Sequence, residues 1–254
     1  MAQKASIPKG TRDFLPAEVA KRNYVTDVIR TQFERYGFLP IQTPAMEKST
    51  TLKGKYGEEG DRLMFNILNS GEKVKKADVN ALQNNALGQF TSSISEKALR
   101  YDLTVPFARF VAQHQNEISF PFKRYQIQSV WRADRPQRGR FQEFTQCDAD
   151  FVGAVSPLQE AECMQLFDDV FDGLALKDAT IRINHRGILA GIAHYLEAPD
   201  RIVDFTVALD KLDKIGVEKV KQELSGKGLS EESINKLDLL FKWMKKFDSF
   251  SKTP

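Results

Sequence analysis

The sequence predicts an α+β fold in which an antiparallel sheet is flanked by helices. One observation is the stretch 123–153, where polar and apolar residues alternate on both sides of an arginine-rich turn, the pattern of two paired strands. A second is the helical spacing of apolar residues in 16–36 and 157–171, before and after those strands. With 254 residues and 41% hydrophobic content, the chain is long enough to bury a full core.

Turn-forming residues lead into the first predicted helix. Gly10 and its neighbouring prolines favour an extended lead-in, and Pro16 suits the first position of a helix, which Gly37 ends. Residues 38–44 then predict a short strand that stops at Pro44, since proline is tolerated at strand ends and edges. On the pattern alone, an ordinary edge strand accounts for this arrangement.

The segment that follows carries weaker signals. Residues 53–62 form a charged, glycine-rich loop that lacks a phosphate-binding spacing of glycines. Residues 63–68 predict a strand. The polar stretch 75–97 is expected to be mobile or weakly helical, and it is a candidate insertion.

A strand leading into a helix is predicted around Asp102 and Thr104. Thr104 suits the N-cap position and Pro106 the first turn, so helix capping accounts for both polar residues. A carboxylate and a hydroxyl this close together are also the acceptors that an ammonium group requires. The residues alone do not distinguish helix capping from the binding of an ammonium group.

Each strand predicted within 123–153 has one polar and one packed face. The polar row comprises Arg124, Gln126, Gln128, Val130 and Arg132 on the first strand, and Phe144, Gln146, Asp148 and Asp150 on the second. The opposite face carries Tyr125, Ile127, Trp131, Cys147, Ala149 and Phe151. A polar row inside a fold of this size indicates a ligand site.

The turn between these strands is strongly basic. Arg135, Arg138 and Arg140 crowd its tip, while Pro136 and Gly139 favour the turn itself. Guanidinium groups repel one another unless an anion is present, and their geometry matches phosphate oxygens. A solvated surface turn is the alternative.

Composition sets limits on the class of protein. Lys plus Arg total 37 against 34 Asp plus Glu, so the net charge of +3 does not by itself indicate a nucleic-acid partner. The sequence also lacks the stripe of basic and aromatic residues that is typical of a simple RNA-binding module. Cys147 and Cys163 form neither a metal-binding pair nor a disulfide framework. Without an apolar signal segment or a membrane-spanning run, a cytoplasmic protein without membrane contact is expected.

The C-terminal part is predicted to be mainly helical. Residues 180–184 alternate as a short strand, and a helix follows over 188–196. From Asp200 onward the chain is charged and helical, with Ser230 as the cap of the last helix. We therefore expect a core over 1–200 and a separate helical segment over 201–254.

The central motif carries a resemblance to a known family. Trp131-Arg132-Ala133-Asp134, followed by Arg140-Phe141-Gln142-Glu143-Phe144, resembles motif 2 of the class II aminoacyl-tRNA synthetases. Gln146-Cys147-Asp148-Ala149-Asp150 is similar to the histidyl-tRNA synthetases in particular. Residues 8–13 resemble that family's N-terminal element, and 36–44 resemble class II motif 1. The expected fold is thus a class II synthetase-like antiparallel sheet flanked by helices.

The resemblance implies an ATP site on the polar row. Arg132 would hold the α-phosphate of ATP and the carboxylate of histidine, and Arg140 would contact the γ-phosphate. Phe144 would stack on adenine, and Asp134, where most class II members carry Glu, would accept from its amino group. Arg132 and Arg140 are the implied catalytic residues, and Mg²⁺ would arrive with ATP.

The resemblance also implies a histidine site. Asp102, Leu103 and Thr104 match the family's segment that holds the α-amino group, and Gln146 would bind the main-chain end of histidine. Asp150 would face the imidazole, a task that suits a carboxylate because it accepts from the ring N–H. Without the resemblance, Asp148 and Asp150 would be candidate ligands of a hard cation.

The implied function is histidine–tRNA ligation: activation of histidine with ATP and transfer to tRNA(His) by a homodimer whose interface includes Pro44. The family's motif 3, histidine-specific segments and anticodon-binding domain have no counterpart in 1–254, so we expect an N-terminal part of the catalytic domain with weak activity. The alternative is a histidine-sensing regulatory subunit of ATP phosphoribosyltransferase. The intact basic turn disfavours it, because a sensor does not need to hold a triphosphate.

Overall fold

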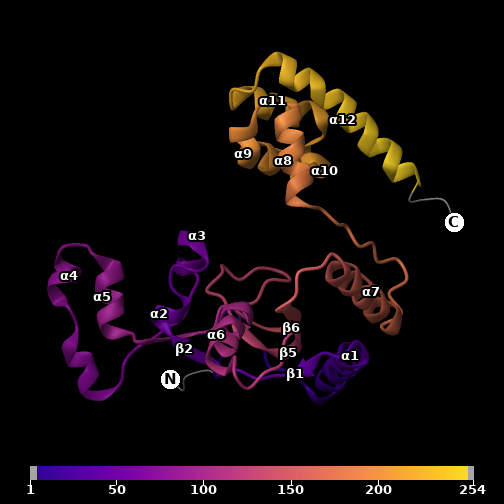
Figure 1. Ribbon diagram of the computed structural model, residues 1–254. Coiled ribbons are helices and arrows are strands. Elements are labelled where there is room, and N and C mark those ends of the chain that lie inside the picture. The colour runs from indigo at the N-terminus through magenta and orange to yellow at the C-terminus, as the bar shows by residue number, and fades with distance from the viewer. Residues whose placement is uncertain (1–4, 251–254) are drawn as a thin grey trace. The chain divides into compact units, whose positions relative to one another are not determined.

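The computed structural model describes residues 5–250 and divides the chain into two compact units, 1–179 and 180–254 (Figure 1). The sequence placed this division after residue 200. The structure places it earlier because helix α8 (Arg186–Tyr195) belongs to the second unit, where Ile192 and the following Leu196 pack into its core.

The first unit is built on a sheet of three strands, in the order β1 (Leu39–Pro40), β5 (Phe122–Trp131), β6 (Glu143–Val152). β1 is parallel to β5, and β5 and β6 pair antiparallel along their whole length. The predicted pair of strands and the α+β class are confirmed. The hairpin could be predicted from the sequence because polar and apolar residues alternate with a period of two, and every second side chain of a strand points to the same face.

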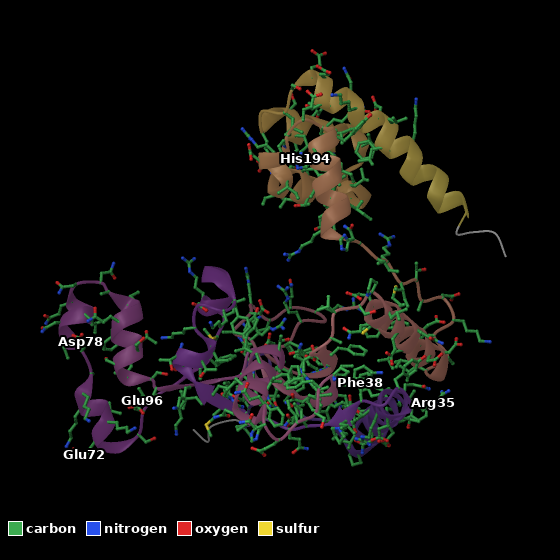
Figure 2. All side chains as sticks on the ribbon, viewed as in Figure 1. Arg35, Phe38, Glu72, Asp78, Glu96 and His194 are labelled. Carbon is green, nitrogen blue, oxygen red and sulfur yellow. The ribbon has the colours of Figure 1, made fainter. Side chains whose placement is uncertain are left out.

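Helices α1 (Pro16–Arg35) and α7 (Leu158–Gly173) cover the apolar face of the hairpin. Their core comprises Phe33, Phe38, Tyr125, Leu166 and Val170, with Ile127, Cys147, Ala149 and Phe151 packed against it. Figure 2 shows Phe38 within this cluster of side chains. Since these residues alternate with the polar row, burying one face leaves the other free to form a site.

A second antiparallel sheet has the order β2 (Met46–Lys48), β4 (Lys97–Leu99), β3 (Asn66–Ile67). The predicted strand over 63–68 is thus shorter than expected. The polar stretch 75–97 is mostly helical: η1 (Gly71–Lys76) is followed by α4 (Val79–Gln83) and α5 (Leu87–Ile94). Short helices α2 (Ser49–Leu52) and α3 (Gly57–Arg62) precede it, and α6 (Thr104–His114) follows β4.

The second unit is helical over its described residues. After α8 come η2 (Pro199–Arg201), α9 (Ile202–Leu209), α10 (Leu212–Ile215), α11 (Val217–Gly226) and α12 (Glu231–Phe250). Ser230 caps the last helix as predicted, its Oγ accepting from the Ser233 backbone N–H at 3.1 Å. The strand predicted over 180–184 does not form: no described strand pairs with it, and an unpaired strand cannot satisfy its backbone groups.

Among the described residues, no helix combines the length and apolar character needed to span a bilayer.

Candidate active site

The polar row predicted from the sequence is one continuous surface of β5 and β6. Across the two strands, Arg124 lies opposite Asp150, Gln126 opposite Asp148, Gln128 opposite Gln146, and Val130 opposite Phe144. Gln126 and Arg124 are fully buried and the other polar side chains of the row are partly buried, so this surface is shielded from solvent along its length. Buried polar groups of this kind require partners, from the protein or from a ligand.

The four residues predicted to bind ATP line one cavity of about 410 Å³ at the turn end of the hairpin: Arg132, Asp134, Arg140 and Phe144. The Arg132 guanidinium lies 5.2 Å from the ring centroid of Phe144 and 4.5 Å from that of Tyr101. Its Nε donates to the Tyr101 carbonyl at 3.2 Å. These contacts orient Arg132 while leaving its two terminal nitrogens available to an anion.

Arg140 is the more exposed of the two predicted catalytic arginines. Its side chain is 59% exposed, and its Nη1 lies 3.6 Å from Asp134 Oδ1, a loose ion pair. Because the guanidinium is exposed and the contact is long, this pair contributes little to stability, so Arg140 can exchange the carboxylate for a phosphate. The Asp134 side chain is 16% exposed.

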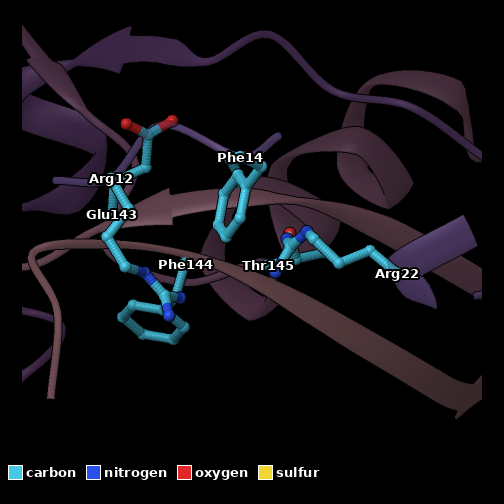
Figure 3. A pocket seen from close by; sticks show the side chains of 7 residues that line it. Arg12, Phe14, Arg22, Glu143, Phe144 and Thr145 are labelled. Carbon is cyan, nitrogen blue, oxygen red and sulfur yellow. The ribbon is translucent and has the colours of Figure 1, made fainter. Parts of the chain in front are cut away.

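The N-terminal segment, expected to lead into α1, and α1 itself supply further walls of the site. Arg12 and Arg22 line the same cavity, and with Phe14 they line an adjoining one of about 180 Å³. The Arg12 guanidinium lies 3.4 Å from the Phe141 ring centroid and 5.0 Å from that of Phe14. Figure 3 shows Arg22 extending from α1 toward Thr145, whose hydroxyl accepts from it at 3.0 Å. No local sequence pattern predicts these contacts, because they join segments that are far apart in the chain.

Gln142 connects the N-terminal segment to the predicted ATP residues. Its backbone N–H donates to the Gly10 carbonyl at 2.8 Å, and its carbonyl accepts from the Arg132 N–H at 2.9 Å. Its side-chain amide donates to the Asp134 carbonyl at 2.9 Å. Gln142 therefore fixes the backbone at both ends of the basic turn.

The far end of the polar row contains an unsatisfied acceptor. Gln146 Oε1 is buried without a hydrogen-bond donor, and Asp150 Oδ2 is buried with Arg124 Nη2 at 2.7 Å as its ion-pair partner. Arg124 also donates to the Leu103 carbonyl at 3.4 Å and to Gln126 Oε1 at 3.3 Å. Buried acceptors without donors are costly, and a ligand with N–H groups would satisfy them.

Negative charge exceeds positive charge at this end. Burial raises the pKa of Asp148 and Asp150 above the ordinary aspartate value, while Arg124 acts in the opposite direction. The carboxylate of Asp102 raises both pKa values further. Three carboxylates against the buried guanidinium of Arg124 form a site that favours a cation.

Asp102 is held by a residue that sequence reasoning passed over. Tyr56, in the loop that showed no site, donates its hydroxyl to Asp102 Oδ1 at 2.7 Å. The same oxygen accepts from the Val105 backbone N–H at 3.3 Å, so Asp102 rather than Thr104 provides the side-chain contact at the start of α6. Thr104 is the exposed first residue of that helix, and Leu103 is fully buried.

Among the described residues, Asp148 and Asp150 do not belong to a group of three or more side chains placed to hold a metal ion. Pro44 is exposed between β1 and β2, with its carbonyl accepting from Arg100 at 3.3 Å.

Comparison with known proteins decides the family. The family model described as histidyl-tRNA synthetase matches residues 83–253. A curated histidine–tRNA ligase from Christiangramia forsetii is 65% identical over 241 residues, which cover 95% of this chain and 53% of that protein. The chain belongs to the histidyl-tRNA synthetase family. The resemblance stated from motifs 1 and 2 is confirmed.

Solved structures agree on the fold. The histidyl-tRNA synthetase from Nostoc sp. PCC 7120 matches with a TM-score of 0.75 and 31% identity over 99% of this chain and 54% of that one. A structure described as an ATP phosphoribosyltransferase regulatory subunit/histidyl-tRNA synthetase, from Bacillus halodurans C, has a TM-score of 0.71 at 19% identity over 93% and 55%, which shows the fold alone. The chain spans about half the length of the family members it matches.

Proposed function

We propose that this chain supplies the ATP- and histidine-binding part of a histidine–tRNA ligase. In this reaction a carboxylate oxygen of histidine attacks the α-phosphorus of ATP, and the bond to pyrophosphate breaks. The histidyl group then passes to tRNA(His). The observation that carries the proposal is one strand face that joins two kinds of site: the donor-free buried oxygen Gln146 Oε1 and the buried carboxylate of Asp150 lie on the face that continues to Phe144 and the arginine-lined cavity.

The arginine-lined end suits ATP. Arg132 would bridge the α-phosphate and the histidine carboxylate, and Arg140 would meet the γ-phosphate. Phe144 would stack on adenine, with Asp134 accepting from its amino group. Chemistry of this kind depends on positioning and charge neutralisation more than on a protein base. Mg²⁺ would accompany ATP and neutralise its phosphate charge.

The carboxylate-rich end suits histidine. Asp102 and Thr104, on the segment that includes Leu103, would receive the α-ammonium group. Gln146 would bind the main-chain end, and Asp150 would accept from the imidazole N–H. An analogue without ring N–H groups could not donate to the Asp150 carboxylate, which would keep Arg124 as its partner but lose the hydrogen bond from the substrate, a basis for rejection.

Further parts of the proposal rest on the family. The partners would be tRNA(His) and a second copy of the chain, with Pro44 in the dimer interface, and the reaction would take place in the cytoplasm. The curated relative that carries the name histidine–tRNA ligase is 65% identical, which supports this function.

The test is histidine-dependent ATP–pyrophosphate exchange in the protein extended to the length of its relatives. Arg132→Ala is expected to lower exchange by about a hundredfold or more, since removing one preorganised charge from a developing oxyanion has effects of this size. Arg186→Ala, an exposed arginine of α8, is the control and keeps the wild-type rate. Wild-type exchange by Arg132→Ala would overturn the assignment.

The 254-residue chain alone is expected to exchange slowly, because the resemblance leaves a second ATP-binding arginine outside it. A regulatory subunit that senses histidine would behave differently: it would bind histidine without any exchange, in the extended protein as well as in the chain alone.

A further inference from the structure

Another cavity of the first unit, away from the β5–β6 hairpin, is lined by lysines and hydroxyl groups. It measures about 370 Å³, and its walls include Lys48 of β2, Lys53 after α2, Lys97 of β4, and Ser49, Thr50 and Ser92. Ser49 and Ser92 come from α2 and α5, so separate stretches of chain meet here (Figure 1). No local pattern in the sequence marks this cluster, because Ser92 and Lys97 are distant in the chain from the other lining residues.

The lysines of this cavity bring like charges close together. Lys48 and Lys97 are directly opposite each other in the antiparallel pairing of β2 and β4, so their side chains leave the sheet on the same face. Like charges at directly opposed positions destabilise a sheet. Lys53 adds a third ammonium group, whose Nζ donates to the Ser92 hydroxyl at 2.9 Å.

The nearby carboxylates are already matched by other cations. Glu47, on the other face of β2, pairs with Arg109 at 2.7 Å. Glu96 lines the cavity but pairs with Lys73, whose charge lowers the pKa of Glu96, and Lys76 and Lys97 act in the same direction. Figure 2 shows Glu96 at the base of the segment that carries α4 and α5.

None of the three cavity lysines has an ion pair with a carboxylate among the side chains that the structure describes. We propose that this cavity binds a phosphate group of an RNA backbone. Ammonium groups and hydroxyls are donors that suit a phosphate, and an anion would relieve the opposition of Lys48 and Lys97.

The composition of the walls favours the RNA backbone over a free nucleotide. No aromatic side chain is among the lining residues, so there is no surface on which a base would stack. Lys76 of η1 extends the positive charge beyond the cavity, which suits a polymer that carries a charge at each step. Contacts of this type position an RNA without reading its sequence. The choice of RNA rests on the proposed function, whereas the anion site itself does not.

The experiment measures binding of a tRNA(His) transcript to the 254-residue chain over a range of salt concentrations, without ATP or histidine. Lys48→Gln is expected to weaken binding about tenfold, as loss of one charge-assisted contact does. It should also reduce the slope of log affinity against log salt by about 1, since one fewer counterion is released. Lys75→Gln is the matched control, because Lys75 lies in the same first unit, on η1, but is already paired with Glu72 at 2.8 Å.

Two further measurements distinguish an RNA-binding role of this cavity from a purely structural one. Lys97→Gln should raise the unfolding temperature of the RNA-free chain at low salt while weakening RNA binding, a combination that simple loss of structure cannot produce. A wild-type salt slope in Lys48→Gln, or a Lys97→Gln chain that binds RNA as the wild type does, overturns the proposal. These binding measurements involve no activation step, so their outcome does not depend on the result of the ATP–pyrophosphate exchange assay.

Discussion

Arg124 and Asp150 lie directly opposite each other on β5 and β6, with Nη2 of the arginine 2.7 Å from Oδ2 of the aspartate. The Arg124 side chain is 0% exposed and its guanidinium lies 4.2 Å from the Phe107 ring centroid. Burial lowers the pKa of Arg124, and the carboxylates of Asp150, Asp148 and Asp102 oppose that shift. The charge of this buried guanidinium therefore depends on the carboxylates around it.

The first prediction concerns removal of one partner of this pair. Asp150→Ala is expected to lower the free energy of unfolding by about 3 kcal/mol, because it leaves a buried charge without its counterion. Asp148→Ala leaves the ion pair intact and should have a much smaller effect. Urea denaturation of both variants at neutral pH is the measurement. Equal losses would show that Asp150 does not hold Arg124 in place.

The pH dependence of stability gives a second prediction. Burial raises the pKa of Asp148 above its ordinary value of 3.8, so the folded chain keeps this proton where the unfolded chain has released it. The resulting stabilisation is complete below pH 3.8 and is lost as the pH rises through the folded-state pKa. Asp148→Asn cannot ionise, so its free energy of unfolding should fall less over that range than that of the wild type. Parallel curves from urea midpoints at successive pH values would contradict this.

A third prediction tests the contact between the N-terminal segment and Gln142. Gly10 has φ +87°, and a Cβ built on it would lie 2.7 Å from Gln142 Cγ. Gly10→Ala should therefore combine left-handed backbone strain with a clash. Gly37→Ala is the matched control, since Gly37 has φ +77° and open space around it.

Gly37→Ala is expected to lower the free energy of unfolding by about 1–2 kcal/mol from the backbone strain alone. Gly10→Ala should lower it further and also weaken ATP binding, because Gln142 anchors both Arg132 and Asp134. Urea denaturation and calorimetric titration with ATP measure the two effects. If Gly10→Ala and Gly37→Ala have the same free energy of unfolding and the same affinity for ATP, the contact between Gly10 and Gln142 does not support the site.

The hairpin was predictable because its information is local. Alternation along 123–153 determined which side chains share a face, and the register of β5 and β6 places Phe144, Gln146 and Asp150 on one surface as expected. Pro16 and Ser230 likewise marked helix starts through their own backbone chemistry. In each case the decisive interactions lie within a few residues or within one antiparallel pair.

Other features depend on contacts that no local pattern encodes. Arg12 and Arg22 reach the site only because the N-terminal segment packs beside β6, and the lysine cavity joins distant segments. Residues 180–184 alternate like a strand, but pairing requires a neighbour that the described residues do not provide. Thr104 has the right side chain for a cap, but it is already the first residue of α6, and the carboxylate of Asp102, two residues earlier, accepts from the Val105 N–H.

The last prediction concerns Tyr56, whose hydroxyl donates to Asp102 Oδ1 at 2.7 Å. Burial, more than any other factor, raises the pKa of Tyr56, so the phenol stays protonated and acts as a fixed donor that orients the carboxylate. Tyr56→Phe should raise the KM for histidine in the exchange assay about tenfold, as loss of a hydrogen bond to a charged group does, and leave the KM for ATP unchanged. Tyr36→Phe is the control, since it removes a similar bond, to Asp169 at 2.8 Å, away from the polar row. If both variants change the KM for histidine equally, or if Tyr56→Phe changes only the KM for ATP, then Asp102 does not bind the amino acid.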